Sequence, residues 1–210
     1  GDGFERHLAP RRGAVKDLSE GLIAVDAELA ANGITTAMLA QSWSWEGGMR
    51  GPEFARRLTQ ELEACRERLY TDIHIQLRVE TFMVEDFEEI AELARHASIR
   101  CVIFNDHMPL RDLEKGKKPS RHIGMALKAG RSPEAHWDYL RALYACREEV
   151  PGAISRLAGA LRAQGVPFGS HDDDSAERRG WYRDLGAAIA EFPETWEALE
   201  AAKGDVTILG

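Results

Sequence analysis

Short apolar segments alternate with longer segments of helical periodicity along the whole chain. The apolar segments, which we expect to be strands, are 35–40, 73–79, 101–105, 167–170, 187–191 and 206–209. The amphipathic segments, which we expect to be helices, are 22–32, 52–70, 85–96, 132–146, 152–164, 174–185 and 195–203. This alternation predicts an α/β fold with a mostly parallel sheet, because parallel strands need a long crossover connection.

One interval between expected strands is much longer than the others. It runs from Asn105 to Pro167 and contains a basic, glycine-bearing segment, Arg111–Arg131, followed by two of the expected helices. Long connections in compact domains often carry function. We therefore expect residues 108–165 to form an insertion or lid with its helices. No linker or internal repeat interrupts the chain, so we expect one domain over residues 1–210.

The composition is typical of a globular domain with an excess of acidic residues. Hydrophobic residues make up 44% of the 210 residues, enough for a core without a disulfide or structural metal. The net charge of −8 argues against nucleic acid and anionic membranes as partners, since both attract basic proteins. No apolar run approaches the roughly 20 residues of a membrane span. The three cysteines include no CxxC pair, which favours a reduced, cytoplasmic compartment.

Residues that bind metals or move protons follow several of the expected strands. Glu80, His107, His171 and Glu191 stand at or just after a strand end, and both histidines have aspartate neighbours. The carboxyl ends of parallel strands meet at one edge of a sheet, where α/β enzymes place their chemistry. Residues 2–7 form a further cluster of this kind, which would lie at the same edge of the sheet if another strand precedes it.

Histidine and carboxylate ligands that converge from separate strands suit a divalent metal ion. Such a metal polarises an electrophile and lowers the pKa of bound water to about 7, which provides a nucleophile. A single strand-end histidine is more often a hydrogen-bonded structural residue. Two of them, each beside an aspartate, together with Glu80 favour a metal site over that structural alternative.

Basic residues near these strand ends are candidates for contacts with an anionic substrate. Arg78 lies on a strand face that would be the interior of a barrel, and an ion pair with Glu80 is the structural alternative. Arg111 and Lys115 follow His107 closely, which favours a phosphate clamp. For this basic run the structural alternative is a solvated face.

Six motifs occur in a fixed order along nearly the whole chain. They are GDGFERHLAPR at 1–11, ANGITT at 31–36, LRVE at 77–80, DH at 106–107 with RDLEK at 111–115, SHDD at 170–173 and EFPET at 191–195. Together they resemble one family of the amidohydrolase superfamily. This is the PhnM family, the alpha-D-ribose 1-methylphosphonate 5-triphosphate diphosphatases of phosphonate degradation by the carbon–phosphorus lyase pathway.

The resemblance implies a metal-dependent (β/α)8 TIM-barrel hydrolase that releases pyrophosphate from a small anionic ribose triphosphate and leaves the 5-phosphate. It also implies a divalent metal, Zn²⁺ or Mn²⁺, as one or two ions. The implied metal ligands are Asp2, Glu80, His107 and His171. The residues that we predict to orient a histidine ligand or act in catalysis are Asp172 and Asp173. The predicted substrate contacts are His7, Arg78, Arg111 and Lys115.

Such a barrel needs roughly 250 residues, so we expect the chain to cover strands 2–7 with the end of strand 1. A metal-binding histidine of the first strand would precede Gly1, and an aspartate of the eighth would follow Gly210. Two alternatives stay open: an amidohydrolase that cleaves a cyclic amide or N-acyl C–N bond, and an inactive metal-binding barrel fragment. The oligomeric state, including a homo-oligomer, stays open as well.

Overall fold

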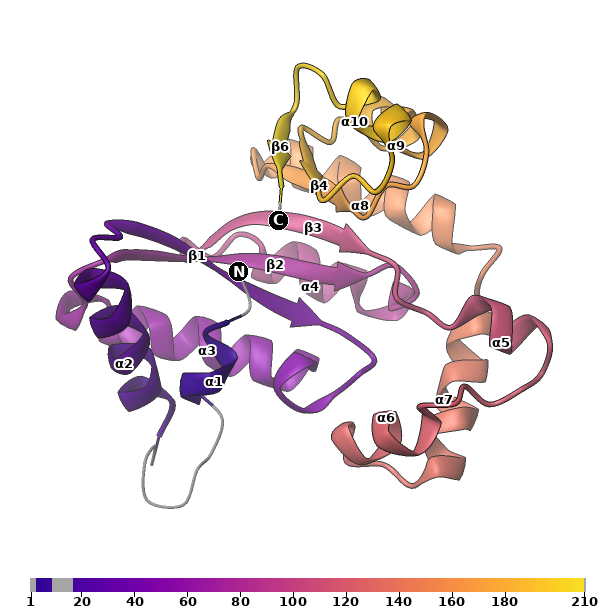
Figure 1. The fold of residues 1–210 in the computed structure, drawn as a ribbon, viewed down its shortest axis with the longest axis horizontal. Helices are drawn as coiled ribbons and strands as arrows, with labels where there is room; N and C mark the ends of the chain where they lie inside the picture. The colour runs from indigo at the N-terminus through magenta and orange to yellow at the C-terminus, as the bar shows by residue number, and fades with distance from the viewer. Residues whose placement is uncertain (1–2, 9–16, 210) are drawn as a thin grey trace.

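One sheet of six parallel strands forms the centre of the computed structural model, which describes residues 3–8 and 17–209 (Figure 1). The strands are β1 (Thr36–Trp43), β2 (Asp72–Glu80), β3 (Ile99–Asn105), β4 (Phe168–His171), β5 (Ile189–Glu191) and β6 (Val206–Ile208). Each strand pairs with the next one along the chain, without the order reversal of a doubly wound sheet. The described residues form an α/β fold whose curled sheet resembles half a barrel and is compatible with an incomplete (β/α)8 barrel.

The two faces of the sheet differ in polarity because side chains alternate along each strand. In β2, Ile73, Ile75 and Leu77 point to one face and are fully buried. Gln76 and Arg78 point to the opposite face and line a cavity. The apolar face is the outer one, under the helices, and burying each such side chain contributes about 1.5–3 kcal/mol. The inner face is therefore where polar chemistry is placed.

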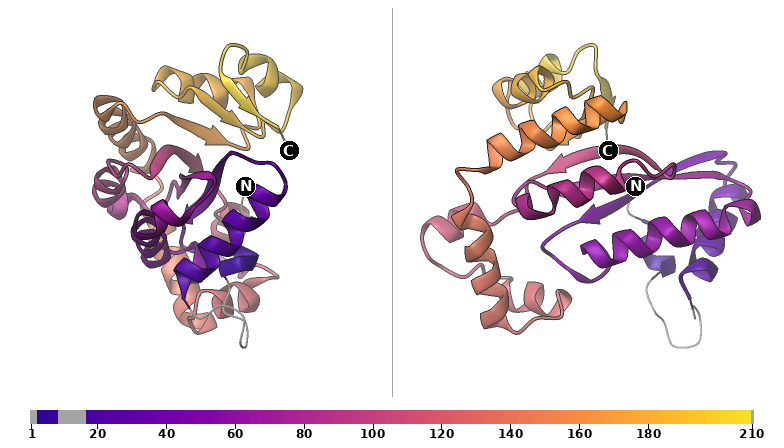
Figure 2. Two further views of the ribbon diagram at one scale, coloured as in Figure 1. Left: turned by 90° about the vertical axis from the view of Figure 1, so that its left-hand side faces the viewer. Right: turned by 180° about the vertical axis from the view of Figure 1, so that it is seen from behind.

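Helices cover the outer face of the sheet. They are α2 (Leu18–Ala31), α3 (Pro52–Cys65), α4 (Phe87–Leu93), α8 (Val150–Gln164), α9 (Ala176–Asp184) and α10 (Trp196–Ala201). The view from behind in Figure 2 shows α3, α4 and α8 lying across the strands. Leu58 of α3, Ile90 of α4 and Leu161 of α8 are all fully buried there. Gly165 ends α8 with a positive φ of 72°, which glycine adopts without steric cost, and the chain then turns into β4.

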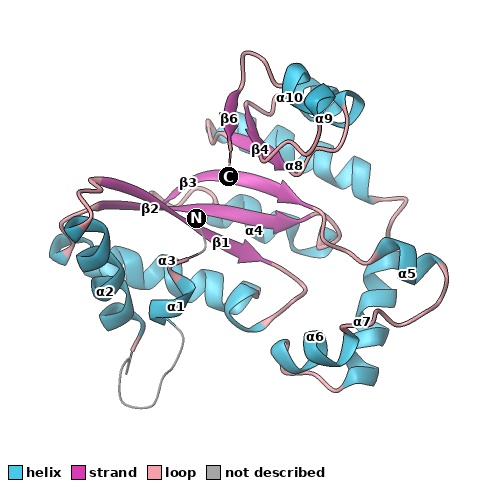
Figure 3. Cartoon of the chain, in the orientation of Figure 1, coloured by secondary structure: helices cyan, strands magenta, loops and turns pink. Residues whose placement is uncertain are grey.

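The long interval between β3 and β4 is helical. It contains α5 (Leu110–Glu114), α6 (His122–Lys128), α7 (Pro133–Ala145) and α8. Figure 3 shows that α5, α6 and α7 stand beyond the arrowheads of β1 to β3, at the carboxyl ends of the strands. Only α8 returns to the outer face of the sheet. The expected insertion thus lies beside the edge where the site residues were predicted.

All six expected strands and seven expected helices occur, but some boundaries were predicted wrongly. The helix expected over 52–70 ends at Cys65 and continues only as a 3-10 turn, η2 (Arg66–Arg68). The helix expected over 85–96 begins with another such turn, η3 (Val84–Asp86), and ends at Leu93. Helix ends commonly tighten in this way. The prediction also missed α1 (Glu5–Leu8), α5 and α6, which are too short to show helical periodicity.

No helix in the described part of the chain combines the length and the apolar character that crossing a membrane requires.

Candidate active site

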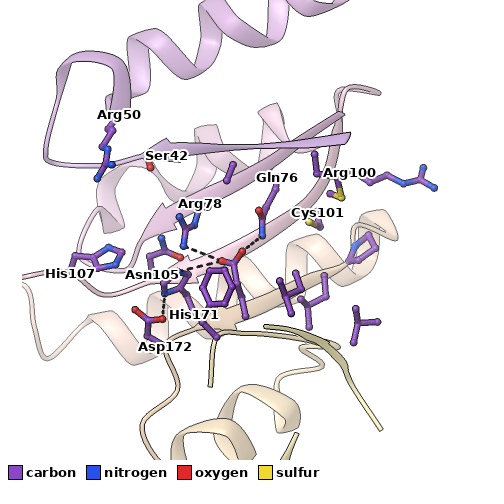
Figure 4. A pocket seen from close by; sticks show the side chains of 18 of the residues that line it. Ser42, Arg50, Gln76, Arg78, Arg100, Cys101, Asn105, His107, His171 and Asp172 are labelled. Carbon is purple, nitrogen blue, oxygen red and sulfur yellow. Dashed lines mark hydrogen bonds and ion pairs between the residues drawn. The ribbon is translucent and has the colours of Figure 1, made fainter. Parts of the chain in front are cut away.

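A cavity of about 920 Å³ lies on the inner face of the sheet. Residues from β1 to β6 line it, so its wall is the concave side of the half-barrel (Figure 4). At the carboxyl ends of the strands the lining residues are Ser42, Arg78, Asn105, His107, His171, Asp172 and Glu191. The opposite end of the wall is apolar and includes Met38, Cys101 and Ile189. The polar groups are thus concentrated at one end of the cavity.

His107 follows β3 and is held by Glu80 at the end of β2. The ring atom Nδ1 lies 2.6 Å from Glu80 Oε1, and the backbone N–H of His107 donates to Oε2 over 3.0 Å. Glu80 is 2% exposed. Its hydrogen bond raises the pKa of His107, more than burial lowers it. Because Nδ1 faces Glu80, the ring nitrogen left for another partner is Nε2.

His171 ends β4, and its imidazole contacts the carboxylate of the next residue, Asp172. Its Nδ1 lies 2.8 Å from Oδ1 of Asp172, and its Nε2 lies 3.6 Å from Oε2 of Glu191. Burial, with smaller effects of the nearby Arg78 and His107, lowers the pKa of His171 to about 3. The ring is therefore neutral and carries a nitrogen lone pair at neutral pH.

Asp172 adopts an uncommon backbone conformation directly after β4. Its φ is 54°, in the left-handed region that few residues other than glycine adopt, although aspartate is among those that tolerate it. This turn places the carboxylate against His171 instead of continuing the strand. Burial raises the pKa of Asp172 above its ordinary value. Strained residues of this kind concentrate at functional sites.

Three side chains come together in an arrangement that fits a metal ion. One donor atom from each of His107, His171 and Asp172 lies within 4.8 Å of the other two, and the two imidazole centroids are 5.5 Å apart. Imidazole nitrogen and carboxylate oxygen are ligands of Zn²⁺ and Mn²⁺. Metal-binding histidines usually donate their second ring nitrogen to a carboxylate. Both histidines have that contact here, one with Glu80 and the other with Asp172.

Glu191 lines the cavity from the end of β5. It is 4% exposed; Gln76 donates to its Oε1 over 2.8 Å, and Nη2 of Arg78 lies 3.2 Å from its Oε2. These contacts join β2 to β5. Figure 4 shows the side chains of Gln76 and Arg78 pointing into the cavity. The sequence indicates that Glu191 stands at a strand end, but no role was predicted for it. The only signal available there was its position before a Phe-Pro pair.

Four further predicted site residues in the described part of the chain do not line the cavity. Asp173 is buried, and its Oδ2 lies 2.5 Å from the hydroxyl of Ser170 and 3.4 Å from Nη1 of Arg179. His7, on α1, pairs with Glu28. Arg111 and Lys115 are exposed on α5 and at its C-terminal end. Asp2 lies outside the described residues. The roles assigned to these five residues stay predictions.

The loop after β1 connects the helical insertion with the site. Trp45 is buried, and its Nε1–H points to Oε2 of Glu80 over 3.3 Å. From the insertion, Arg131 donates to the backbone carbonyl of Trp45 over 2.8 Å, and His136 of α7 packs its ring 6.1 Å from the indole. No site role was predicted for Arg131 or His136. No signal in the sequence pairs Arg131 with a loop 86 residues earlier.

One curated protein supports the resemblance that the motifs suggest. The chain is 24% identical over 206 residues to the alpha-D-ribose 1-methylphosphonate 5-triphosphate diphosphatase of Escherichia coli (strain K12). The chain resembles this diphosphatase. The match covers 96% of the chain and 54% of the relative, so the chain spans about half the length of the curated relative. No protein-family profile matches the chain. No solved structure matches it either.

Proposed function

We propose that the chain forms the metal-binding part of a hydrolase that cleaves alpha-D-ribose 1-methylphosphonate 5-triphosphate to the 5-phosphate and pyrophosphate. The observation that carries this proposal is the convergence of His107, His171 and Asp172 within 4.8 Å at the polar end of the cavity. The similarity to a diphosphatase supports the choice of reaction. The proposed substrate is a small anion, and the proposed pathway is phosphonate degradation in the cytoplasm.

His107 and His171 would hold the metal through the ring nitrogens that do not face their carboxylate partners, and Asp172 would orient the ring of His171 from its Nδ1 side. Glu80 and Asp2 stay proposed ligands, and Zn²⁺ or Mn²⁺, as one or two ions, is the proposed metal. When bound, a divalent metal of this kind polarises a phosphoryl oxygen and makes water nucleophilic at neutral pH. We propose a divalent metal because imidazole nitrogens and carboxylate oxygens are the donor atoms at this site.

The protein's own residues would fix geometry and charge around the reacting phosphate. Glu80 holds the imidazole of His107 in one tautomer, and Asp172 does so for His171. Arg78 reaches the cavity from β2, and its planar guanidinium suits a phosphate oxygen. Arg111 and Lys115 would add positive charge from α5, at the edge where the strands end. Asp173, paired with Arg179, would support the turn that carries Asp172.

Metal analysis tests the site directly. We expect the purified chain to bind Zn²⁺ or Mn²⁺, and His107→Ala and His171→Ala each to lower the affinity by about 100-fold, since even indirect partners of a ligand are worth 10–100-fold. His96→Ala is the matched control, because His96 follows α4 and its ring accepts a hydrogen bond from the backbone N–H of Ser98. Unchanged metal affinity in both site variants would refute the proposed metal centre.

Substrate panels test the reaction. We expect pyrophosphate release from the ribose triphosphate in the presence of metal, and its loss in His107→Ala and His171→Ala. Hydrolysis of cyclic amides or N-acyl compounds, without pyrophosphate release, would replace the proposal by amidohydrolase activity. Stoichiometric metal binding without turnover of either class would identify the chain as a metal-binding fragment.

A further inference from the structure

We infer that Glu191 is an additional ligand of the cation that His171 holds, a role that rests on the proposed metal site. The resemblance to the diphosphatase family gave no ligand on this strand. Glu191 ends β5, the strand after the one that carries His171, and its side chain turns into the cavity. The site would then draw on three consecutive strands, with a donor just after β3 and donors at the last residues of β4 and β5.

The two oxygens of Glu191 have different surroundings. Oε1 accepts the hydrogen bond of Gln76, whereas Oε2 is buried and accepts no hydrogen bond from any described residue. A buried carboxylate oxygen without a hydrogen bond is costly unless a cation compensates it. Oε2 faces Nε2 of His171 at 3.6 Å and Nη2 of Arg78 at 3.2 Å. Both contacts are longer than a good charge-assisted hydrogen bond.

The spacing between His171 and Glu191 suits two ligands of one cation. Nδ1 of His171 lies 2.8 Å from the carboxylate of Asp172, so Nε2 is the ring nitrogen that remains to bind a cation. Nε2 is also the ring atom that lies beside Oε2 of Glu191. Two ligands at about 2.0–2.2 Å from a tetrahedral metal lie about 3.4 Å from each other. The observed 3.6 Å is close to that separation.

Arg78 offers a competing explanation for Glu191. The guanidinium lies near the same oxygen, so Glu191 could serve only to neutralise Arg78 in a buried setting. In that case, removing the charge of Glu191 would weaken metal binding indirectly, by leaving an unpaired arginine beside the site. The effect would then vanish when Arg78 is neutral as well. If Glu191 is a direct ligand, removing its charge would weaken metal binding both with Arg78 present and with Arg78 neutralised.

A double-mutant cycle separates these explanations. The affinity of the chain for Co²⁺ and Zn²⁺ would be measured by competition with a chromogenic chelator for wild type, Glu191→Gln, Arg78→Gln and the double variant. We expect Glu191→Gln to lower the affinity by about 100-fold in both backgrounds and to change the visible spectrum of bound Co²⁺. Glu197→Gln is the matched control, because it removes an exposed carboxylate six residues later, in the first turn of α10.

Each outcome decides the inference. A loss that disappears in the Arg78→Gln background, or no loss at all, would overturn Glu191 as a ligand while the proposed metal site stands. A wild-type chain that binds neither metal would overturn both. If Glu191→Gln fails to fold, Glu191→Asp replaces it, since this variant keeps the charge that neutralises Arg78 but withdraws the oxygen. A direct ligand predicts weaker binding in Glu191→Asp, and a neutralising role predicts unchanged binding.

Discussion

Nδ1 of His107 and Oε1 of Glu80 lie 2.6 Å apart, and the same carboxylate also binds the backbone N–H of His107. Glu80 therefore fixes both the ring and the loop that carries it. The hydrogen bond raises the pKa of His107 above its ordinary 6.5. Below that raised pKa the ring is protonated in the metal-free protein, and a proton competes with any metal.

We expect Glu80→Gln to lower the pKa of His107, because the negative acceptor is lost while burial remains. NMR titration of the imidazole in chelator-treated protein would measure this pKa. Glu46→Gln is a suitable control, since Glu46 makes only a minor contribution to the pKa of His107. A pKa that stays at its wild-type value in Glu80→Gln would mean that the pair does not form in solution.

Arg179 is expected to be a position at which stability is highly sensitive to substitution. It is fully buried, donates to the backbone carbonyls of Ala187 and Ile189, and pairs with Asp173 and Asp205. We expect Arg179→Met to lower the free energy of unfolding by about 3–5 kcal/mol, because two carboxylates lose their buried partner. Urea unfolding would measure the change.

The control for this variant is Arg183→Met. Arg183 pairs with the same Asp205, but its side chain is 41% exposed. Exposed ion pairs contribute about 0–1 kcal/mol. Equal losses for the two variants would contradict the buried role of Arg179.

Arg131 is expected to hold the helical insertion against the site loop. It donates to the carbonyl of Trp45, and its guanidinium lies 4.3 Å from the ring centroid of Tyr139. We expect Arg131→Ala to increase amide hydrogen exchange in α6, α7 and the loop at 44–47, because these segments lose their shared contact. Arg141→Ala on the exposed side of α7 is the control. Unchanged exchange in Arg131→Ala would show that other contacts hold the insertion.

His136 is expected to make the insertion sensitive to acid. Its side chain is fully buried, and burial lowers its pKa below the ordinary 6.5. As the pH falls, His136 therefore takes up its proton at a higher pH in the unfolded chain than in the folded protein. The free energy of unfolding decreases as a result below about pH 6.5. We expect His136→Leu to reduce the slope of the unfolding free energy between pH 7 and pH 5 in chelator-treated protein. An identical slope in wild type and variant would contradict this assignment.

The sequence predicts the fold better than it predicts the site. All six strands are apolar runs with a clear signal, and the positions of their carboxyl ends are enough to predict that His107 and His171 lie at one edge of the sheet. The contact between Gln76 and Glu191 joins positions 115 residues apart, and no local pattern encodes it. Asp173 looked equivalent to Asp172, but Asp172 lines the cavity beside His171, whereas Asp173 is buried against Ser170 and Arg179.

The candidate site joins residues that lie far apart in the sequence. Its members come from β2, the ends of β3 and β4, and β5, and the β3–β4 connection alone spans more than sixty residues between Asn105 and Phe168. His107, which follows β3, and His171, which ends β4, belong to different βα units. Closing the chain across such distances costs conformational entropy, and only the contacts formed after closure offset that cost. A bound cation would therefore stabilise only the completed sheet, so metal affinity would report whether the strands have closed around the cavity.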